Sequence, residues 1–363
     1  MKKVFVTVLL VAFCASLASA QLLIGAKAGG MGGAGVANVT DLAAAYYNPA
    51  ALMRSNVKAA EVKASLGATY TDPTDVMSAL GKAGDPASFI ADSYSKALSF
   101  TGNIDGVIGV NVKKVGISIL PELSSTVQKN ANSLESNMSV TGQYATVVTL
   151  GKTFAPSFLP ATVDVGVNAK YITAYSSSIT TTGTATNASG TKAYGSGTGY
   201  GFDIGALTTF TVPYVTELKV GVVARNLLQS VTYANKTQPY YLNYNGTTAT
   251  VTSGAETALA DSTTTVNPSY VVGASAVVPG INLLVATDLE YTTSGTNSHL
   301  GLEYPILLNL VLLRAGTANG NGLAKTTVGA KINFPIFTLD AVIVSDANNS
   351  SALSYIVDVN LGW

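Results

Sequence analysis

The sequence is short of cysteine, histidine and charge. Cys14 is its only cysteine, His299 is its only histidine, and charged residues make up 11% of the 363 residues. Soluble domains carry roughly 25% charged residues. A lone cysteine excludes a disulfide framework and a thiolate metal site. Basic and acidic residues balance at 20 each, and no basic patch indicates a nucleic-acid partner.

Long apolar runs are also missing. No segment after residue 20 approaches the roughly 18 consecutive apolar residues that a membrane helix needs, although the mean hydropathy is +0.34. Only helices and closed β-barrels satisfy their backbone hydrogen bonds inside a bilayer. An apolar chain without a membrane helix therefore predicts an all-β fold, an antiparallel transmembrane β-barrel.

The first twenty residues have the pattern of a cleaved export signal. Lys2 and Lys3 form a positive start, an apolar stretch covers 4–17, and small residues at 18–20 form the cleavage site. We expect the mature chain to begin at Gln21. Export followed by membrane insertion places the protein in the outer membrane of a bacterium.

The rest of the chain divides into two parts. A Gly- and Ala-rich segment, 21–56, shows no alternation, whereas 57–363 consists of short alternating segments with turn residues between them. We predict about fourteen strands, an even number as bacterial single-chain barrels require. They lie near 57–70, 105–112, 115–121, 138–155, 161–180, 199–212, 216–234, 266–278, 281–293, 297–304, 306–316, 325–334, 336–345 and 352–363.

The connections between these strands alternate between short and long along the chain. The even-numbered ones are tight and mostly contain proline, as at Pro279, Pro305 and Pro335, whereas most odd-numbered ones are longer and polar. Outer-membrane barrels have short periplasmic turns and longer outer loops. With the N-terminus on the periplasmic side, the odd connections face outward: 71–104, 122–137, 181–198, 235–265, 294–296, 317–324 and 346–351.

The strands alternate apolar and polar side chains. Val163, Val165 and Val167 share one face of a strand, and Asp164 and Asn168 share the other. The low overall charge indicates that the apolar faces point to lipid. The last strand alternates in the same way and ends on an aromatic residue, which is typical of the signal read by the barrel-assembly machinery. Its aromatic residues are Tyr355 and Trp363.

Two segments predict helices instead of strands. Residues 41–53 read as a short helix capped by Thr40 or Asp41. Residues 86–99 place apolar side chains at helical spacing within the first outer loop. That second helix could pack on the barrel rim or cover the mouth of the pore.

The N-terminal segment resembles that of the long-chain fatty-acid transporter superfamily, the FadL/TodX-like barrels. The shared pattern is a glycine-rich stretch over 25–37, then an aspartate, small residues and Asn-Pro-Ala. The residues that match it are Gly29, Gly30, Gly32, Gly33, Asp41, Asn48, Pro49 and Ala50. The C-terminal third, at 299–304 and 312–316, is closer to the PorV-like and TraF-like branch of the superfamily.

This resemblance implies a fourteen-stranded barrel with a small N-terminal plug inside it. In such transporters the plug blocks the bore, and hydrophobic molecules leave sideways into the membrane. The glycines would let the plug backbone approach the wall closely, and Pro49 would stop the short helix. A plug that only fills the bore, with no part in transport, is the alternative.

The charged residues of the strands predict a polar network in the lumen rather than a catalytic site. They fall on the polar faces, where they should pair with one another and with plug backbone. They are Asp164, Lys170, Asp203, Arg225, Asp288, Glu290, His299, Glu303, Lys331, Asp340 and Asp358. Arg314 alternates in step with Leu308, Leu310 and Leu312, on the apolar face of its strand. This position indicates a bulge or a place near the membrane interface.

The sequence thus predicts a monomeric barrel without catalytic residues, metal or cofactor. Its function would be uptake of hydrophobic, fatty-acid-like molecules across the outer membrane, in contact with outer-membrane lipid. The alternative is a non-transporting scaffold that binds a protein of a secretion, conjugation or surface-layer complex.

Overall fold

The computed structural model describes residues 23–54, 60–70, 91, 93–112, 114–157, 161–212 and 215–362. The predicted export signal and Trp363 lie outside these residues. Within them, no helix has both the length and the apolar character needed to cross a membrane.

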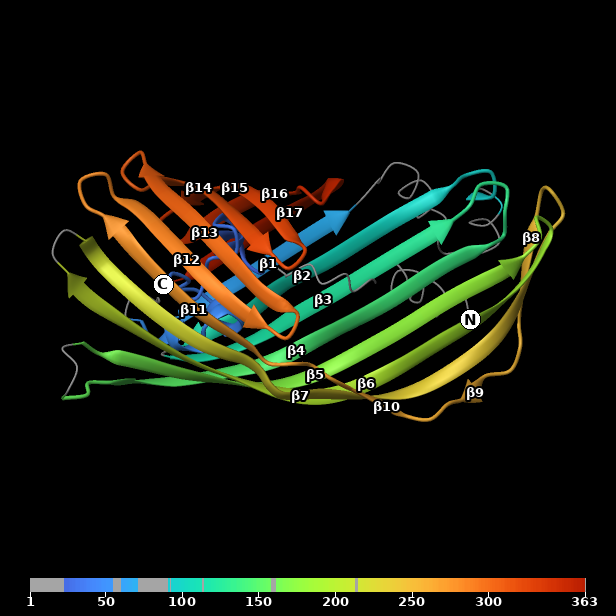
Figure 1. Ribbon diagram of the computed structural model, residues 1–363, viewed down its shortest axis with the longest axis horizontal. Helices are drawn as coiled ribbons and strands as arrows, with labels where there is room; N and C mark the ends of the chain where they lie inside the picture. Colours follow the sequence, from blue (N-terminus) through green and yellow to red (C-terminus); the bar gives the residue numbers. More distant parts are fainter. Residues whose placement is uncertain are drawn as a thin grey trace.

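The chain folds into a closed antiparallel barrel of fourteen strands, as the sequence predicts (Figure 1). The barrel closes where the first strand pairs with the last, with Lys63 opposite Asn360. Three further short strands, β8 to β10, lie in the connection between β7 and β11 and pair with β7. The strands of the barrel are β1 (Ala60–Tyr70), β2 (Leu98–Val112), β3 (Val115–Lys129), β4 (Ser136–Phe154), β5 (Val163–Gly183), β6 (Asn187–Val212), β7 (Val215–Tyr244), β11 (Ser269–Val278), β12 (Leu283–Thr292), β13 (Gly295–Ile306), β14 (Val311–Gly320), β15 (Leu323–Asn333), β16 (Phe337–Asp346) and β17 (Asn349–Gly362). The short strands are β8 (Ala249–Ser253), β9 (Thr257–Ala258) and β10 (Ser262–Thr265).

The predicted parity of the faces is confirmed. On β5, Val167 is 43% exposed on the outside of the barrel, whereas Asp164 and Asn168 are buried within it. The last strand follows the same rule, with Tyr355 outside and Asp358 inside. An apolar outer face and a polar inner face are what a barrel needs when lipid surrounds it.

Aromatic side chains mark the outer edge of the apolar belt. Tyr171 pairs with Tyr200 across β5 and β6, and Tyr270 pairs with Tyr291 across β11 and β12. All four are about half exposed, from 46% to 57%. Tyrosines gather at both edges of the hydrocarbon layer, where one end of the ring is apolar and the other is wet. We call these four residues the outer aromatic band.

The strands differ greatly in length, and this corrects several predicted boundaries. Strands β11, β12, β14 and β16 each have 10 residues, close to the 9–11 that a tilted strand needs to cross a bilayer. Strands β4 to β7 have 19 to 30 residues and extend far beyond the ends of strands β11 to β17 (Figure 1). Most of 122–137, 181–198 and 235–265, predicted as loops, is therefore strand. These segments read as loops because hydroxyl and amide side chains replace the apolar alternation there.

The turn predicted at Pro305 lies a few residues later. Pro305 is still in β13, opposite Leu312, and the turn covers 307–310. Leu307, Leu308 and Asn309 have positive φ angles of 50° to 69°. The parity restarts after this turn, so Arg314 points into the lumen and is buried. It needs neither a bulge nor a place at the membrane interface, and both explanations are wrong.

The N-terminal segment lies inside the barrel as three short helical pieces (Figure 1). They are α2 (Ala26–Gly30), α3 (Ala44–Tyr47) and the 3₁₀ helix η1 (Pro49–Met53). The helix predicted over 41–53 is thus broken at Asn48, whose φ of −162° is extended, since Pro49 cannot continue the preceding helix. Asp41 accepts a hydrogen bond from Ala43 N, but the cap position of α3 is Ala43.

Of the helix predicted over 86–99, residues 86–90 and 92 lie outside the described residues. Ala91 and Ser93 are helical, and 94–97 form a turn and an irregular stretch. The last two residues of the predicted helix, Leu98 and Ser99, belong to β2 and not to a helix. Tyr94 packs on Tyr244 with ring centroids 4.4 Å apart, which joins this segment to the inner face of the extended β7.

Candidate functional site

The contact between the plug and the barrel wall rests on glycines of both. Gly166 faces Pro49 so closely that a Cβ at position 166 would lie 2.3 Å from the Pro49 carbonyl carbon. A Cβ at Gly205 would lie 2.0 Å from Asn48 Oδ1. On the other side of the barrel, a Cβ at Gly301 would lie 2.3 Å from the Cβ of Met31. No other residue fits these places without moving the plug.

These wall glycines form rows across neighbouring strands. The ladders pair Gly151 with Gly166, Gly166 with Gly205, Gly221 with Gly273, and Gly301 with Gly316. Each row makes a flat patch on which plug backbone lies. The sequence pattern predicted only the plug glycines at this contact. The wall glycines lie on the polar faces of their strands, and this was the only signal for them in the sequence. Their alignment into rows depends on the strand register, which a single sequence does not reveal.

Asn48, predicted from the Asn-Pro-Ala pattern, joins the plug to the wall. Its side-chain Nδ2 donates to Val36 O at 3.0 Å and to Ala206 O of β6 at 3.1 Å. Its Oδ1 accepts from Ala50 N at 3.1 Å and so caps the 3₁₀ helix. A buried amide with three partners fixes both the turn in the plug and its height in the barrel.

Side chains of the wall also bind the glycine-rich part of the plug. Asp288 Oδ2 accepts from Gly35 N at 2.7 Å and from Val36 N at 2.9 Å. His299 Nδ1 lies 2.7 Å from Gly32 O. Thr327 Oγ1 donates to the carbonyl of Gly30 at 3.0 Å. The single histidine therefore contacts plug backbone, and among the described residues no group of three or more potential ligands could hold a metal ion.

A buried arginine links three strands to the plug. Arg314 Nε lies 2.6 Å from Glu303 Oε2, and its Nη1 lies 2.6 Å from Asp340 Oδ2. Nη1 also donates to Ala26 O at 3.4 Å. Glu303 and Asp340 belong to the predicted lumen network, whereas Arg314 was not predicted to be part of it. Lys331, also in that network, is half-buried opposite Asp340 in the β15–β16 ladder.

A second charged group lies beside the start of α2. Lys63 Nζ is 2.7 Å from both Asp41 Oδ2 and Asp358 Oδ2, and Asp358 Oδ2 accepts from Ala26 N at 2.7 Å. Burial by itself would raise the pKa of the Asp41 carboxyl, but the charge and hydrogen bond of Lys63 outweigh it and hold that pKa below its ordinary value. Lys63 was not among the predicted lumen charges, although it alternates with Val62 and Ala64 and this alternation is a signal for an inward position.

The remaining predicted charges also have partners. Lys170 Nζ lies 2.6 Å from Asp203 Oδ1. Asp164 Oδ2 lies 2.8 Å from Arg54 Nε at the end of the plug. Arg225 Nη1 lies 3.5 Å from Glu290 Oε1, and its guanidinium carbon is 5.0 Å from the centre of the Tyr46 ring. Among the plug glycines, Gly29 faces Ile356 and Gly33 faces His299.

Strand β7 is bulged where it passes the plug. Tyr200 of β6 pairs with Ser230 and Ile204 pairs with Ala224, so β7 uses two more residues than β6 over this stretch. Asn226 and Leu228 have positive φ angles of 58° and 54°, which is uncommon for residues other than glycine. We call 226–229 the β7 bulge. Leu228 is 78% exposed on its outer side.

On its other edge, β7 also changes its partner strand at the β7 bulge, from β11 to β10. The ladder to β11 ends at Arg225, and the ladder to β10 resumes at Ser230. Between them, Val266 N donates to Gln229 O at 2.9 Å. On the inner side, Asn226 N donates to Asp203 Oδ1 at 2.8 Å. The β7 bulge is thus the place where the ladders on both edges of β7 are irregular, next to side chains that border the plug.

The fold and these contacts define a fourteen-stranded, membrane-type β-barrel with an N-terminal plug, and the fold is that of the FadL/TodX-like barrels. It is similar to the toluene transporter TbuX of Ralstonia pickettii, at TM-score 0.58 and 11% identity over 94% of this chain and 99% of that one. It is similar to the toluene transporter TodX of Pseudomonas putida, at 0.53 and 10% over 92% and 95%. A FadL homologue of Pseudomonas aeruginosa gives 0.52 and 10% over 93% and 97%. No family model matches the sequence, and neither does any curated protein.

Proposed function

We propose that this protein takes up hydrophobic small molecules across the outer membrane of a bacterium and releases them sideways into the membrane at the β7 bulge. The barrel has an apolar outer belt with an aromatic edge, which suits a protein embedded in lipid. The structures that it resembles include two toluene transporters. We therefore propose hydrophobic molecules as the substrate class of this protein too.

The observation that supports the proposal most is the position of the β7 bulge. It disrupts the ladders on both edges of one strand at the level of the outer aromatic band, between Ala224 opposite Tyr270 and Ser230 opposite Tyr200. It adjoins Arg225, which packs on Tyr46 of the plug. Exposed Leu228 makes its outer side apolar. A hydrophobic molecule gains free energy at about 25 cal/mol per Å² when it leaves water, so a path from the bore to lipid at this place needs no further energy source.

The charges around the plug fit the same function. Arg314 is paired with Glu303 and Asp340 and donates to Ala26 O of α2, so the charged side chains beside α2 are joined to one another and to the plug. Such a bore excludes hydrophilic solutes while the plug is seated. On the extensions of β5 to β8 and the connection to β11, the exposed large apolar side chains are Tyr241 and Leu259. Two isolated side chains are less than the continuous apolar patch that a scaffold for another protein would need.

The test removes the β7 bulge. Deletion of Leu227 and Leu228 equalises the numbers of residues on β6 and β7 and should restore a regular ladder between these two strands. The matched control deletes Gly246 and Thr247 from the turn between β7 and β8. Both variants are first checked for insertion by their mobility in gels before and after heating.

The measurement is the uptake of a radiolabelled long-chain fatty acid and of toluene by cells that express each form. We expect the β7-bulge deletion to lower uptake to that of cells without the protein, and the control to retain full uptake. Equal uptake by all cells, including those without the protein, would contradict uptake and favour a scaffold. Full uptake by cells that express the β7-bulge deletion would contradict sideways release at this place.

A further inference from the structure

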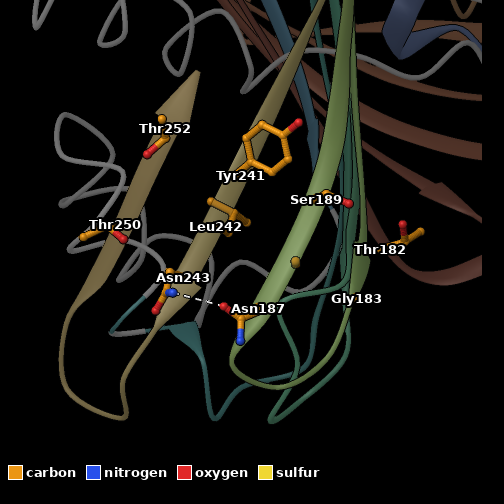
Figure 2. Close-up of a pocket in the computed structure, with 10 residues that line it drawn as sticks. Thr182, Gly183, Asn187, Ser189, Tyr241, Leu242, Asn243, Thr250 and Thr252 are labelled. Carbon is orange, nitrogen blue, oxygen red and sulfur yellow. Dashed lines mark hydrogen bonds between the residues drawn. The ribbon is translucent and has the colours of Figure 1, made fainter. Parts of the chain in front are cut away.

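A cleft opens at the far end of the long strands, well beyond the outer aromatic band. Its volume is about 470 Å³, and strands β5 to β8 form it (Figure 2). The residues that line it are Thr182, Gly183, Asn187, Ala188, Ser189, Tyr241, Leu242, Asn243, Thr250 and Thr252. None of them is charged, and seven carry a hydroxyl or an amide.

The strand register arranges these side chains in two rows. In the first row Ser189 pairs with Thr182 on one side and with Tyr241 on the other, and Tyr241 pairs with Thr252. In the second row Asn243 lies between Asn187 and Thr250. Paired residues share a face of the sheet, with neighbouring strands about 4.8 Å apart. The cleft is thus built from a regular grid of hydroxyl and amide groups.

The grid faces away from the inside of the barrel. Tyr241 is 58% exposed, whereas the alternating Leu242 is buried together with Ala188 in a cluster with Leu134. Tyr94 packs on this buried side. Figure 2 shows the ring of Tyr241 on β7, and the hydrogen bond from Asn243 Nδ2 to Asn187 Oδ1 at 3.0 Å.

The chemistry of the cleft selects one class of ligand. Without a charged side chain it offers nothing to a phosphate or a carboxylate, and its hydroxyls and amides disfavour a hydrocarbon. Hydroxyl and amide groups both donate and accept, as the hydroxyls of a sugar do. An exposed tyrosine adds a flat apolar face with a polar end. A protein partner would need apolar anchors, and the cleft has only this one ring.

The height of the cleft indicates the source of the sugar. Ser189 lies eleven positions beyond Tyr200 on β6, about 36 Å along the strand at roughly 3.3 Å per residue. The outward face of the strand at that height is surrounded by the sugar chains of outer-leaflet lipopolysaccharide and not by its acyl chains. This step rests on the proposed outer-membrane location, but not on uptake.

We propose that this cleft binds neutral sugar residues of the lipopolysaccharide chains that surround the barrel. Tyr241 stacks on a sugar ring, and Asn187, Ser189, Asn243 and the two threonines of β8 bind its hydroxyls. Such binding fixes the long strands in the sugar layer, where they have no lipid to pack against.

The test measures binding of three probes to the detergent-purified full chain by saturation-transfer NMR and titration. The probes are oligosaccharide released from the lipopolysaccharide of the cells that express the protein, lipopolysaccharide truncated to its lipid and inner core, and a maltodextrin. The variants are Tyr241→Ala and, as a matched control, Tyr171→Ala, which removes a ring with 57% exposure from the outer aromatic band. Heated and unheated gel mobility checks that both are folded.

We expect the released oligosaccharide to bind, Tyr241→Ala to weaken it at least tenfold, and Tyr171→Ala to leave it unchanged. Truncated lipopolysaccharide and maltodextrin should bind at least tenfold more weakly. No binding of any sugar, or equal binding by the wild type and Tyr241→Ala, would overturn the proposal. Equal binding of maltodextrin would overturn the assignment to the surrounding membrane. Deletion of the β7 bulge should leave binding intact, so a failure here is distinct from a failure of uptake.

Discussion

Gly166 of the barrel wall and Pro49 of the plug are in direct backbone contact, with room for a hydrogen atom but not for a methyl group between them. The contact recurs where Gly301 meets Met31 on the opposite side. The plug is therefore seated by close fit to a wall of glycine rows, and the charged pairs around it fix its position.

Replacing Gly166 by alanine should loosen the plug. The added methyl group forces a shift of backbone, and overpacking of this kind costs about 1–3 kcal/mol. Amide hydrogen exchange over 44–53, measured by mass spectrometry, should be about tenfold faster or more. The matched variant Ala169→Val adds two methyl groups on the outward face of the same strand and should leave this exchange unchanged. Equal protection in both variants would mean that the glycine rows do not position the plug.

Arg314→Met should destabilise the barrel strongly, because it leaves Glu303 and Asp340 as buried carboxylates without their partner. Breaking one side of a buried pair costs about 3–5 kcal/mol. The comparison is Lys236→Met, since Lys236 and Glu256 are both about half exposed, and a solvent-screened surface pair of this kind contributes little to stability. The midpoint of urea unfolding in detergent measures both. A loss in Arg314→Met no larger than that in Lys236→Met would show that the buried group does not stabilise the plug and wall.

The plug should weaken in acid because of Asp41. Its pKa is lower in the folded protein than in the unfolded chain, so its contribution to stability is present above the unfolded value, ordinarily about 3.9, and is lost as the pH falls through the folded value. Hydrogen exchange of α2 measured from about pH 7 to about pH 2 tests this.

In that experiment the wild type should lose protection only in the acid part of the range, after correction for the intrinsic rate. Asp41→Asn should be less protected at neutral pH and should change less with acid. The exposed Asp261→Asn serves as the control and should follow the wild type. A variant Asp41→Asn with the same acid dependence as the wild type would assign that dependence to other carboxylates.

The sequence predicted the architecture because a barrel in lipid imposes a simple rule on each strand. Val167 outside and Asp164 inside follow from alternation alone, and every predicted strand corresponds to one in the structure. The alternation of apolar and polar side chains is lost where the strands extend beyond the lipid. Beyond Tyr171 and Tyr200 the outward faces of the strands are mostly polar or small, while apolar side chains such as Ile172 lie on the inner face. The extensions therefore read as loops although they continue the sheet.

The site was predictable only in part, for a different physical reason. Asp288 and Asn48 could be selected from parity and from the resemblance, but their partners depend on how the chain closes in space. Gly166 and Gly205 lie 39 positions apart and become one patch only through the β5–β6 register. The β7 bulge depends on a mismatch in residue number between two strands, which no local pattern shows.

The measurement that tests the central claim most directly is the selectivity of uptake. Cells with an intact lipopolysaccharide outer leaflet, with and without the protein, are given a radiolabelled fatty acid and a radiolabelled sugar of similar mass. A seated plug and an apolar exit through the wall predict that the protein raises fatty-acid uptake at least tenfold and leaves sugar uptake unchanged. Fatty-acid uptake that does not depend on the protein, or equal entry of the sugar, would contradict the account.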